Sequence, residues 1–154
     1  MVLVTAGVGP IKENAKQDHD GFSLFFSTAG LGSNMGTLQP TFRVKGLAYS
    51  YTREQNSYYG ERTLESQAVC SGSIRRTSID SIISLAKSVG DTLVYRTNVS
   101  IMSGSTSGLT IDDENVHVRF SLHNDSDPIA DKILAILNSN LPPDKVKLTI
   151  CCSH

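Results

Sequence analysis

The feature that most constrains this chain is a change of hydrophobic period within residues 115–141. Residues 116–123 alternate between apolar and polar side chains, which is typical of a strand with one buried face. The apolar positions are Val116, Val118, Phe120 and Leu122, and the polar positions are His117, Arg119, Ser121 and His123. This part of the chain therefore predicts a strand with an apolar row to bury.

The period becomes helical directly after that strand. Asp127 is a suitable N-cap, and Pro128 fits the first turn, where a missing N–H costs nothing. The apolar residues then follow at helical spacing, at Ile129, Ile133, Ile136, Leu137 and Leu141. Two prolines at 142–143 end the helix. A half-buried strand is thus predicted to run directly into an amphipathic helix, and the apolar sides of both need cover.

Short strand patterns make up most of the remaining chain. An N-terminal hairpin is predicted from a short strand at 2–4, a Gly/Pro turn and a returning strand that begins at Ile11. Further strands are predicted at 22–27, 41–52, 61–70, 93–102 and 145–152. Residues 103–114 are rich in Ser and Gly and end in acidic residues, so a flexible loop is expected there.

One further helix is predicted, at residues 77–90. Its apolar residues lie at helical spacing, Ser78 is a possible cap, and Gly90 is a good terminator. The alternative for this segment is a short strand at 82–85.

The middle of the chain is predicted to be a β-meander with one markedly polar face. The strand predicted at 41–52 has a face that carries Arg43, Lys45 and Tyr49, opposite Phe42 and Val44. The strand at 61–70 carries polar residues on one face as well, namely Thr63, Glu65 and Gln67.

Length and charge limit the classes of protein that fit this chain. At 154 residues it is one domain, 1–154, that can bury a core. The net charge of -1 gives no global field, so any claim of RNA binding must rest on local placement of charge. No apolar run approaches the roughly 20 residues of a membrane helix, and the N-terminus lacks the basic start of a signal peptide. No membrane partner is therefore expected.

No set of residues predicts catalysis, a metal site or a cofactor. Serines are abundant, but no Gly-x-Ser-x-Gly elbow occurs. The Gly-rich segments 7–10 and 104–108 both lack the Lys-Ser/Thr ending of a phosphate loop. Cys151 and Cys152 could bind a metal with His154, but adjacent cysteines rarely form a zinc site without a second pair elsewhere. The protein is therefore not expected to be an enzyme, although a small hydrolase that uses Ser and His stays an alternative.

The strand-to-helix unit resembles the coat proteins of single-stranded RNA bacteriophages, the levivirus group. The residues that carry the resemblance are 116–127 followed by 133–141, the basic alternating strand at 41–45, the polar strand at 62–67 and the opening residues 2–9. The resemblance implies an α+β fold with an N-terminal hairpin, an antiparallel β-meander sheet and a C-terminal helix. The segment 74–91 departs from the family pattern as an insertion, and the tail after residue 143 lacks a second helical segment.

The resemblance also implies an interlocked homodimer, in which each subunit lays its helix across the sheet of its partner. The implied interface residues are Val116, Val118, Phe120 and Leu122, covered by Ile133, Ile136 and Leu137 of the other chain. Dimers would then assemble into an icosahedral shell that packages genomic RNA. The virion is the implied location, after assembly in the cytoplasm of a bacterial host.

The inner sheet face of such a shell would contact single-stranded RNA. The candidate contacts are Arg43, Lys45, Tyr49, Thr63, Glu65, Gln67, His117 and Arg119. Glu65 would accept from a base amino group or pair with Lys45. The cysteines Cys70, Cys151 and Cys152 are candidates for a disulfide between subunits, with an inert thiol as the alternative for Cys70. A dimeric RNA-binding or regulatory domain that forms no shell is the alternative function.

Overall fold

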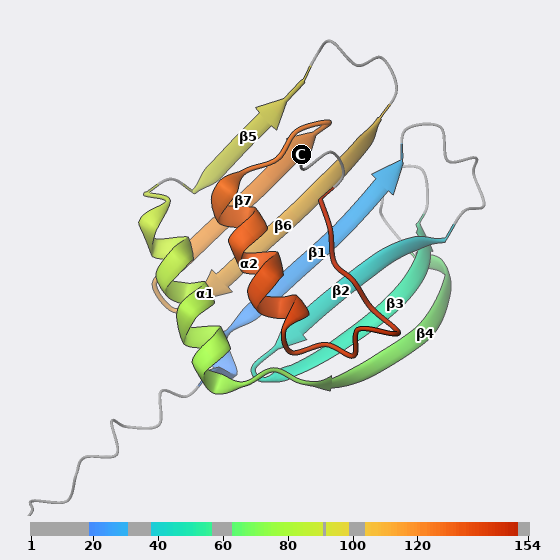
Figure 1. The fold of residues 1–154 in the computed structure, drawn as a ribbon, viewed down its shortest axis with the longest axis horizontal. Coiled ribbons are helices and arrows are strands. Elements are labelled where there is room, and N and C mark those ends of the chain that lie inside the picture. The colour runs from blue at the N-terminus through green and yellow to red at the C-terminus, as the bar shows by residue number, and fades with distance from the viewer. Residues whose placement is uncertain (1–18, 31–37, 57–62, 91, 99–103, 151–154) are drawn as a thin grey trace, which may run out of the picture.

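The computed structural model describes residues 19–30, 38–56, 63–90, 92–98 and 104–150, and shows an α+β fold (Figure 1). Within these residues one sheet contains seven strands in the order β4-β3-β2-β1-β6-β7-β5. The strands are β1 (Ser23–Gly30), β2 (Gln39–Lys45), β3 (Ala48–Asn56), β4 (Thr63–Ser73), β5 (Leu93–Thr97), β6 (Ser105–Asp113) and β7 (Val116–His123). The helices are α1 (Arg76–Ser88) and α2 (Pro128–Asn138), and a 3-10 turn, η1 (His19–Gly21), precedes β1.

The sheet is mixed, and this corrects the prediction of a wholly antiparallel sheet. Strands β1 to β4 do form an antiparallel meander, as predicted, and β6 pairs antiparallel with both β1 and β7. Strand β5, however, pairs parallel with β7 and forms one edge of the sheet. The opposite edge is β4.

The strand predicted at 41–52 is in fact a hairpin. Strand β2 ends at Lys45 and β3 begins at Ala48, with a tight turn at Gly46, whose φ of +60° suits glycine. The turn reverses the chain, so the alternation does not continue through it. Tyr49 therefore faces the same side as Phe42, and their ring centroids are 5.5 Å apart. The prediction that Tyr49 shares the polar face of Arg43 and Lys45 was wrong.

The segment predicted as a flexible loop at 103–114 is largely strand β6, paired with a neighbour on each side. The residues of β6 alternate in burial at its centre, where Ser107, Leu109 and Ile111 face the core. The period-two pattern was present in the sequence, but the high content of Ser, Thr and Gly obscured it.

The strand-to-helix unit at 115–141 is confirmed. Strand β7 alternates between buried and more exposed residues, as the period predicts. Asp127 caps α2, because its side chain accepts hydrogen bonds from the backbone N–H groups of Ile129 and Ala130 at 2.9 and 3.2 Å.

Helix α1 is confirmed over the strand alternative for 82–85, but its cap differs from the prediction. Ser78 lies inside the helix and is buried, and the N-cap residue is Arg75, whose own side chain makes no capping bond. The backbone N–H of Arg75 instead donates to Asn140 Oδ1 at 2.9 Å. Asn140 follows α2, so the end of one helix anchors the start of the other. Gly90, with a φ of +74°, follows α1 as its terminator, as predicted.

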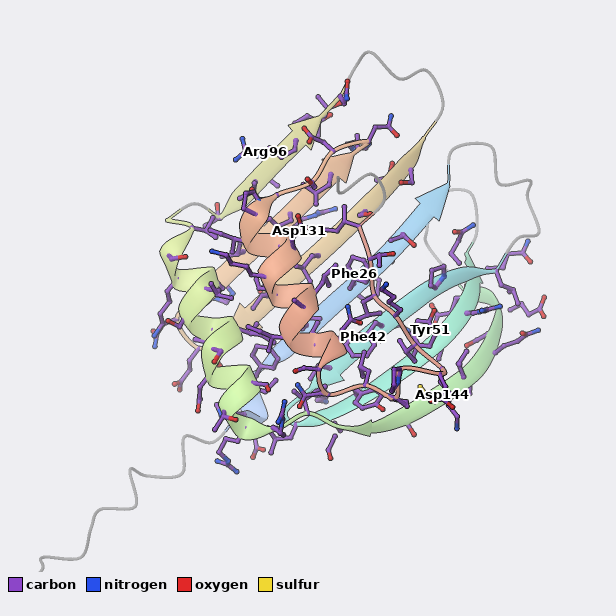
Figure 2. The ribbon with its side chains drawn as sticks, viewed as in Figure 1. Phe26, Phe42, Tyr51, Arg96, Asp131 and Asp144 are labelled. Carbon is purple, nitrogen blue, oxygen red and sulfur yellow. The ribbon has the colours of Figure 1, made fainter. Side chains whose placement is uncertain are left out.

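Both helices and the segment 141–150 cover the same face of the sheet (Figure 1). Residues 145–150 do not form a regular strand, although their burial alternates through Val146, Leu148 and Ile150. The Asn138 side chain holds this segment by two 2.8 Å hydrogen bonds with the backbone of Leu148. Phe26, Phe42 and Tyr51, labelled in Figure 2, belong with Val146, Leu148 and Ile150 to one core cluster of the described residues.

The apolar row of β7 is buried within one chain. Val116, Val118, Phe120 and Leu122 share the core cluster with Ile133 and Leu137, and Ile136 packs partly buried against it. Burial of this row therefore needs no second molecule, and exchange of helices between subunits stays a prediction. The predicted N-terminal hairpin, Cys151 and Cys152 lie outside the described residues.

Candidate nucleic-acid interface

The sheet has a second face that neither α1 nor α2 covers, here called the helix-free face. Its members follow from the strand register, because residues paired directly across neighbouring strands point to the same side. The helix-free face carries Ala48, Ser50 and Thr52 of β3, Arg43 and Lys45 of β2, Ser23, Phe25 and Ser27 of β1, Thr110 and Asp112 of β6, His117, Arg119 and His123 of β7, and Leu93 and Tyr95 of β5.

Four residues form a row across the middle of this face. Phe25 pairs with Arg43 on one side and with Thr110 on the other, and Thr110 pairs with Arg119. Three strand spacings separate the two arginines, so the row spans about 14 Å at right angles to the strands. An aromatic ring therefore lies between two cationic side chains on the helix-free face.

Phe25 is the most unusual member of the row, because it is an apolar side chain on a polar face. It is 38% exposed, whereas its neighbours Leu24 and Phe26 are buried in the core. The Arg43 guanidinium lies over its ring, 5.2 Å from the centroid, which is cation–π distance. Sequence reasoning missed Phe25, although strict alternation from Phe22 onward places it among serines on the outer face.

Glu54 holds Arg43 in this position. The two NH groups of Arg43 donate to the carboxylate oxygens of Glu54 at 2.6 and 3.0 Å, and Thr52 Oγ1 adds a third hydrogen bond at 2.9 Å. Glu54 is buried, and the hydrogen bond from Arg43 lowers the pKa of its carboxyl group despite that burial. Arg43 is thus oriented by its partner, and its charge is largely neutralised.

This ion pair makes the free energy of unfolding depend on pH in the acidic range. Because the pKa of Glu54 is lower in the folded than in the unfolded protein, its contribution is complete above the ordinary glutamate value of 4.5. The contribution is lost as the pH falls below that value through the folded pKa. We expect the free energy of unfolding, from urea titrations between pH 3 and 7, to fall less steeply below pH 4.5 in Glu54→Gln than in the wild type. Glu65→Gln, at an exposed glutamate, is the control and should follow the wild type; identical slopes in all three proteins would contradict the assignment.

Lys45 and Arg119 are the unneutralised cations of the helix-free face. Among the described residues neither makes an ion pair, whereas Arg43 is bound to Glu54 and His117 Nδ1 lies 2.9 Å from Asp112 Oδ1. These two side chains are therefore available to bind an anionic ligand.

A second aromatic group lies at the β5 edge of the same face. Tyr95 is 58% exposed, and its ring centroid lies 5.5 Å from that of His123. Thr106 Oγ1 fixes the His123 ring, at 3.0 Å from Nδ1. Tyr95 is also next to Leu93, which pairs with Arg119, so the central row continues to this edge.

The structure brings together four of the eight predicted RNA contacts. Arg43, Lys45, His117 and Arg119 all lie on the helix-free face. Tyr49 does not: it is buried on the covered face, where burial and the neighbouring Cys70 thiol raise the pKa of its hydroxyl. The prediction that Tyr49 contacts RNA was therefore wrong, and Tyr49 is a core residue.

The contacts predicted on β4 belong to the other side of the sheet. Gln67 pairs with Arg53 and Glu65 with Gln55, which places both on the face opposite Arg43 and Lys45. Glu65 lies 3.4 Å from Gln67 Nε2 rather than near Lys45, so the predicted pairing with Lys45 was wrong. Thr63 pairs with Asn56 through its backbone at the start of β4, and its side chain lies outside the described part.

Within the described ranges, two other kinds of site are absent. No group of three or more His, Cys, Asp or Glu side chains there is placed to hold a metal ion. No helix in those ranges is long and apolar enough to cross a membrane. Comparison of the chain with protein-family models gave no match, and comparison with curated proteins gave none either.

Proposed function

We propose that this protein binds single-stranded RNA on the helix-free face and assembles with copies of itself, as a coat subunit of an RNA bacteriophage does. The observation that carries the proposal is the row Arg43, Phe25, Thr110 and Arg119, in which an exposed aromatic ring lies between cationic side chains. The ring offers a surface on which bases can stack, and Arg119 in the row and Lys45 beside it on β2 offer counter-charges for phosphates.

Single-stranded RNA suits this surface better than a duplex does. In a duplex the bases are stacked on one another, so their faces are not free to lie on Phe25 or Tyr95. An unpaired strand can place bases on these rings while Lys45 and Arg119 contact the flanking phosphates. The net charge of -1 is no obstacle, because the binding charges are local.

The edge strand β4 supports assembly. It is eleven residues long, and Glu65 is its only charged residue. Residues 65–69 are exposed, including Val69. Long edge strands with few charges and no proline pair readily with another strand, and natural monomers usually protect them. We propose that β4 pairs with β4 of a second copy and continues the sheet into a dimer.

A different RNA-binding protein, which forms no shell, is the second candidate. It is favoured by the burial of the β7 row within one chain, because a subunit whose core is complete does not depend on a partner for folding. Both candidates use the same RNA-binding face, and the size of the assembly distinguishes them.

Size-exclusion chromatography with light scattering, recorded at 260 and 280 nm, tests the proposal on protein purified from bacteria. We expect the wild type to elute as a large particle with absorbance shifted toward 260 nm. Val69→Lys places a charge on the exposed β4 edge of both copies and should release small species that cannot build the particle.

Thr97→Lys is the matched control, because it adds the same charge to an exposed position on the opposite edge strand, β5. It should leave the particle intact. A wild-type peak of monomer mass that contains no nucleic acid would contradict the coat assignment. A Val69→Lys particle of unchanged mass would instead exclude β4 as the assembly edge and favour exchange of helices.

A further inference from the structure

The helix-free face contains a hollow beside Phe25 that the proposed contacts with phosphates do not explain. It has a volume of about 440 Å³ and is lined by residues of η1, β1, β2 and β6, among them Phe25, Lys45, Thr110, Asp112 and Asp20. That volume lies within the usual range of sites for small organic groups. This inference rests on the proposed RNA binding and concerns which base the hollow accepts.

The charge of the hollow argues against a phosphate as its occupant. Asp20 and Asp112 line it together with Lys45 and Arg43, so the lining carries acidic groups as well as basic ones. Arg43 is in addition already bound to Glu54. A group with N–H donors is therefore a better fit than an anion, and Phe25 at the wall provides a face for a flat ring to stack on.

Asp112 supplies the acceptors that would select the base. Its Oδ1 lies 2.9 Å from His117 Nδ1, which fixes the carboxylate in place. An ionised carboxylate has about four lone-pair sites, so Asp112 keeps acceptor capacity on both oxygens. Its side chain is half exposed and lies on the strand next to Phe25.

From this geometry we infer that the hollow binds one unpaired guanine, stacked on Phe25 and held by Asp112. Guanine is the base whose Watson–Crick edge presents two adjacent N–H donors, N1–H and N2–H, which match the two oxygens of a carboxylate. Adenine and cytosine present one amino donor beside an acceptor nitrogen, and uracil presents one N–H between two carbonyl groups. Lys45 would then bind the phosphate of the same or the adjoining nucleotide.

The test measures dissociation constants for labelled nine-nucleotide RNAs by fluorescence anisotropy, on protein stripped of nucleic acid at high salt. One RNA is all uridine, and the others carry G, A, C or inosine at the centre. We expect the G-containing RNA to bind about 5- to 100-fold more tightly than the uridine RNA, the discrimination of a bidentate contact. Inosine, which lacks the 2-amino group, should lose most of this advantage.

In Asp112→Asn the affinity for the G-centred RNA should exceed that for the uridine RNA by no more than about twofold, because an amide offers one acceptor oxygen where the carboxylate offers two. Asp113→Asn is the matched control: it removes the same charge one residue along β6, on the other face, and should keep the ratio. Equal binding of G-, A-, C- and U-centred RNA would overturn the guanine site but leave the RNA-binding face in place. Failure of every RNA to bind would overturn the proposed function itself.

Discussion

Replacing Lys45 and Arg119 together by glutamine is expected to weaken RNA binding by more than about 100-fold, or roughly 3 kcal/mol. Each side chain is an unneutralised cation on the helix-free face, and a hydrogen bond to a charged group contributes about 1.5–3 kcal/mol. The loss should be the same for RNAs of different sequence, because phosphates carry no sequence information. A plot of the logarithm of the binding constant against that of salt concentration should lose about 0.7 of slope for each lost contact.

The control for this pair is Lys87→Gln with Lys132→Gln, which removes two positive charges from the exposed sides of α1 and α2. Both double variants change the net charge equally, so if only the net charge of the protein mattered, RNA binding would weaken to the same extent in both. If the position of the charges matters, binding weakens only in Lys45→Gln with Arg119→Gln. Equal losses, or no loss in Lys45→Gln with Arg119→Gln, would contradict the assignment of the phosphate contacts.

Replacing Leu122 by alanine is expected to lower the free energy of unfolding by about 2–5 kcal/mol. Leu122 is 1% exposed and belongs to the β7 row, so its truncation leaves a cavity in the core beneath the helices. A loss of this size is a large share of the stability of an ordinary domain. Urea unfolding followed by circular dichroism measures it.

The matched control is Leu93→Ala on the neighbouring strand β5, where the same substitution is made at a side chain that is 57% exposed. It should cost less than about 1 kcal/mol, because little apolar surface is withdrawn from water there. The measurements are made in the Val69→Lys background at two protein concentrations. A midpoint independent of concentration agrees with burial of the row within one chain, whereas a strong dependence would show that a second chain supplies its cover.

The strand-to-helix unit could be predicted from sequence because every signal within it is local. The alternation of β7, the Asp127 cap and the helical period of α2 all agree over a short stretch. The same holds for α1, whose apolar residues and terminator Gly90 lie close together in the chain. The hydrogen bond that anchors the start of α1 could not be predicted in this way, because Asn140 lies 65 residues from Arg75.

The errors in the fold have two physical sources. At Gly46 a two-residue turn interrupts a pattern that reads as continuous, and the reversal exchanges the faces of every later residue in the strand. In β6 and β5 the pairing partner decides the structure: β6 is a central strand despite its Ser and Gly content, and β5 is parallel to β7. The alternation within β6 is local, but the central position of β6 and the direction of β5 are set by pairing between distant segments.

The candidate site was predicted in part for the same reasons. Arg43, Lys45, His117 and Arg119 were placed correctly because alternation within one strand is a local property. That β2 and β7 lie on either side of β1 and β6 is a property of the sheet order, which brings Arg43 and Arg119 to the two ends of one row. Phe25 was not identified because it lies between two other apolar residues, Leu24 and Phe26, so the strand at 22–27 was predicted without an assignment of its faces.

Photo-crosslinking tests the claim that RNA binds the helix-free face most directly. A nine-nucleotide RNA with 4-thiouridine at one position is bound to the wild-type protein and irradiated, and the crosslinked residues are identified by mass spectrometry. We predict crosslinks at Phe25 and Tyr95 and at the neighbouring residues of β1, β2 and β7. Crosslinks confined to α1, α2 or the segment 141–150, on the covered side of the sheet, would contradict it.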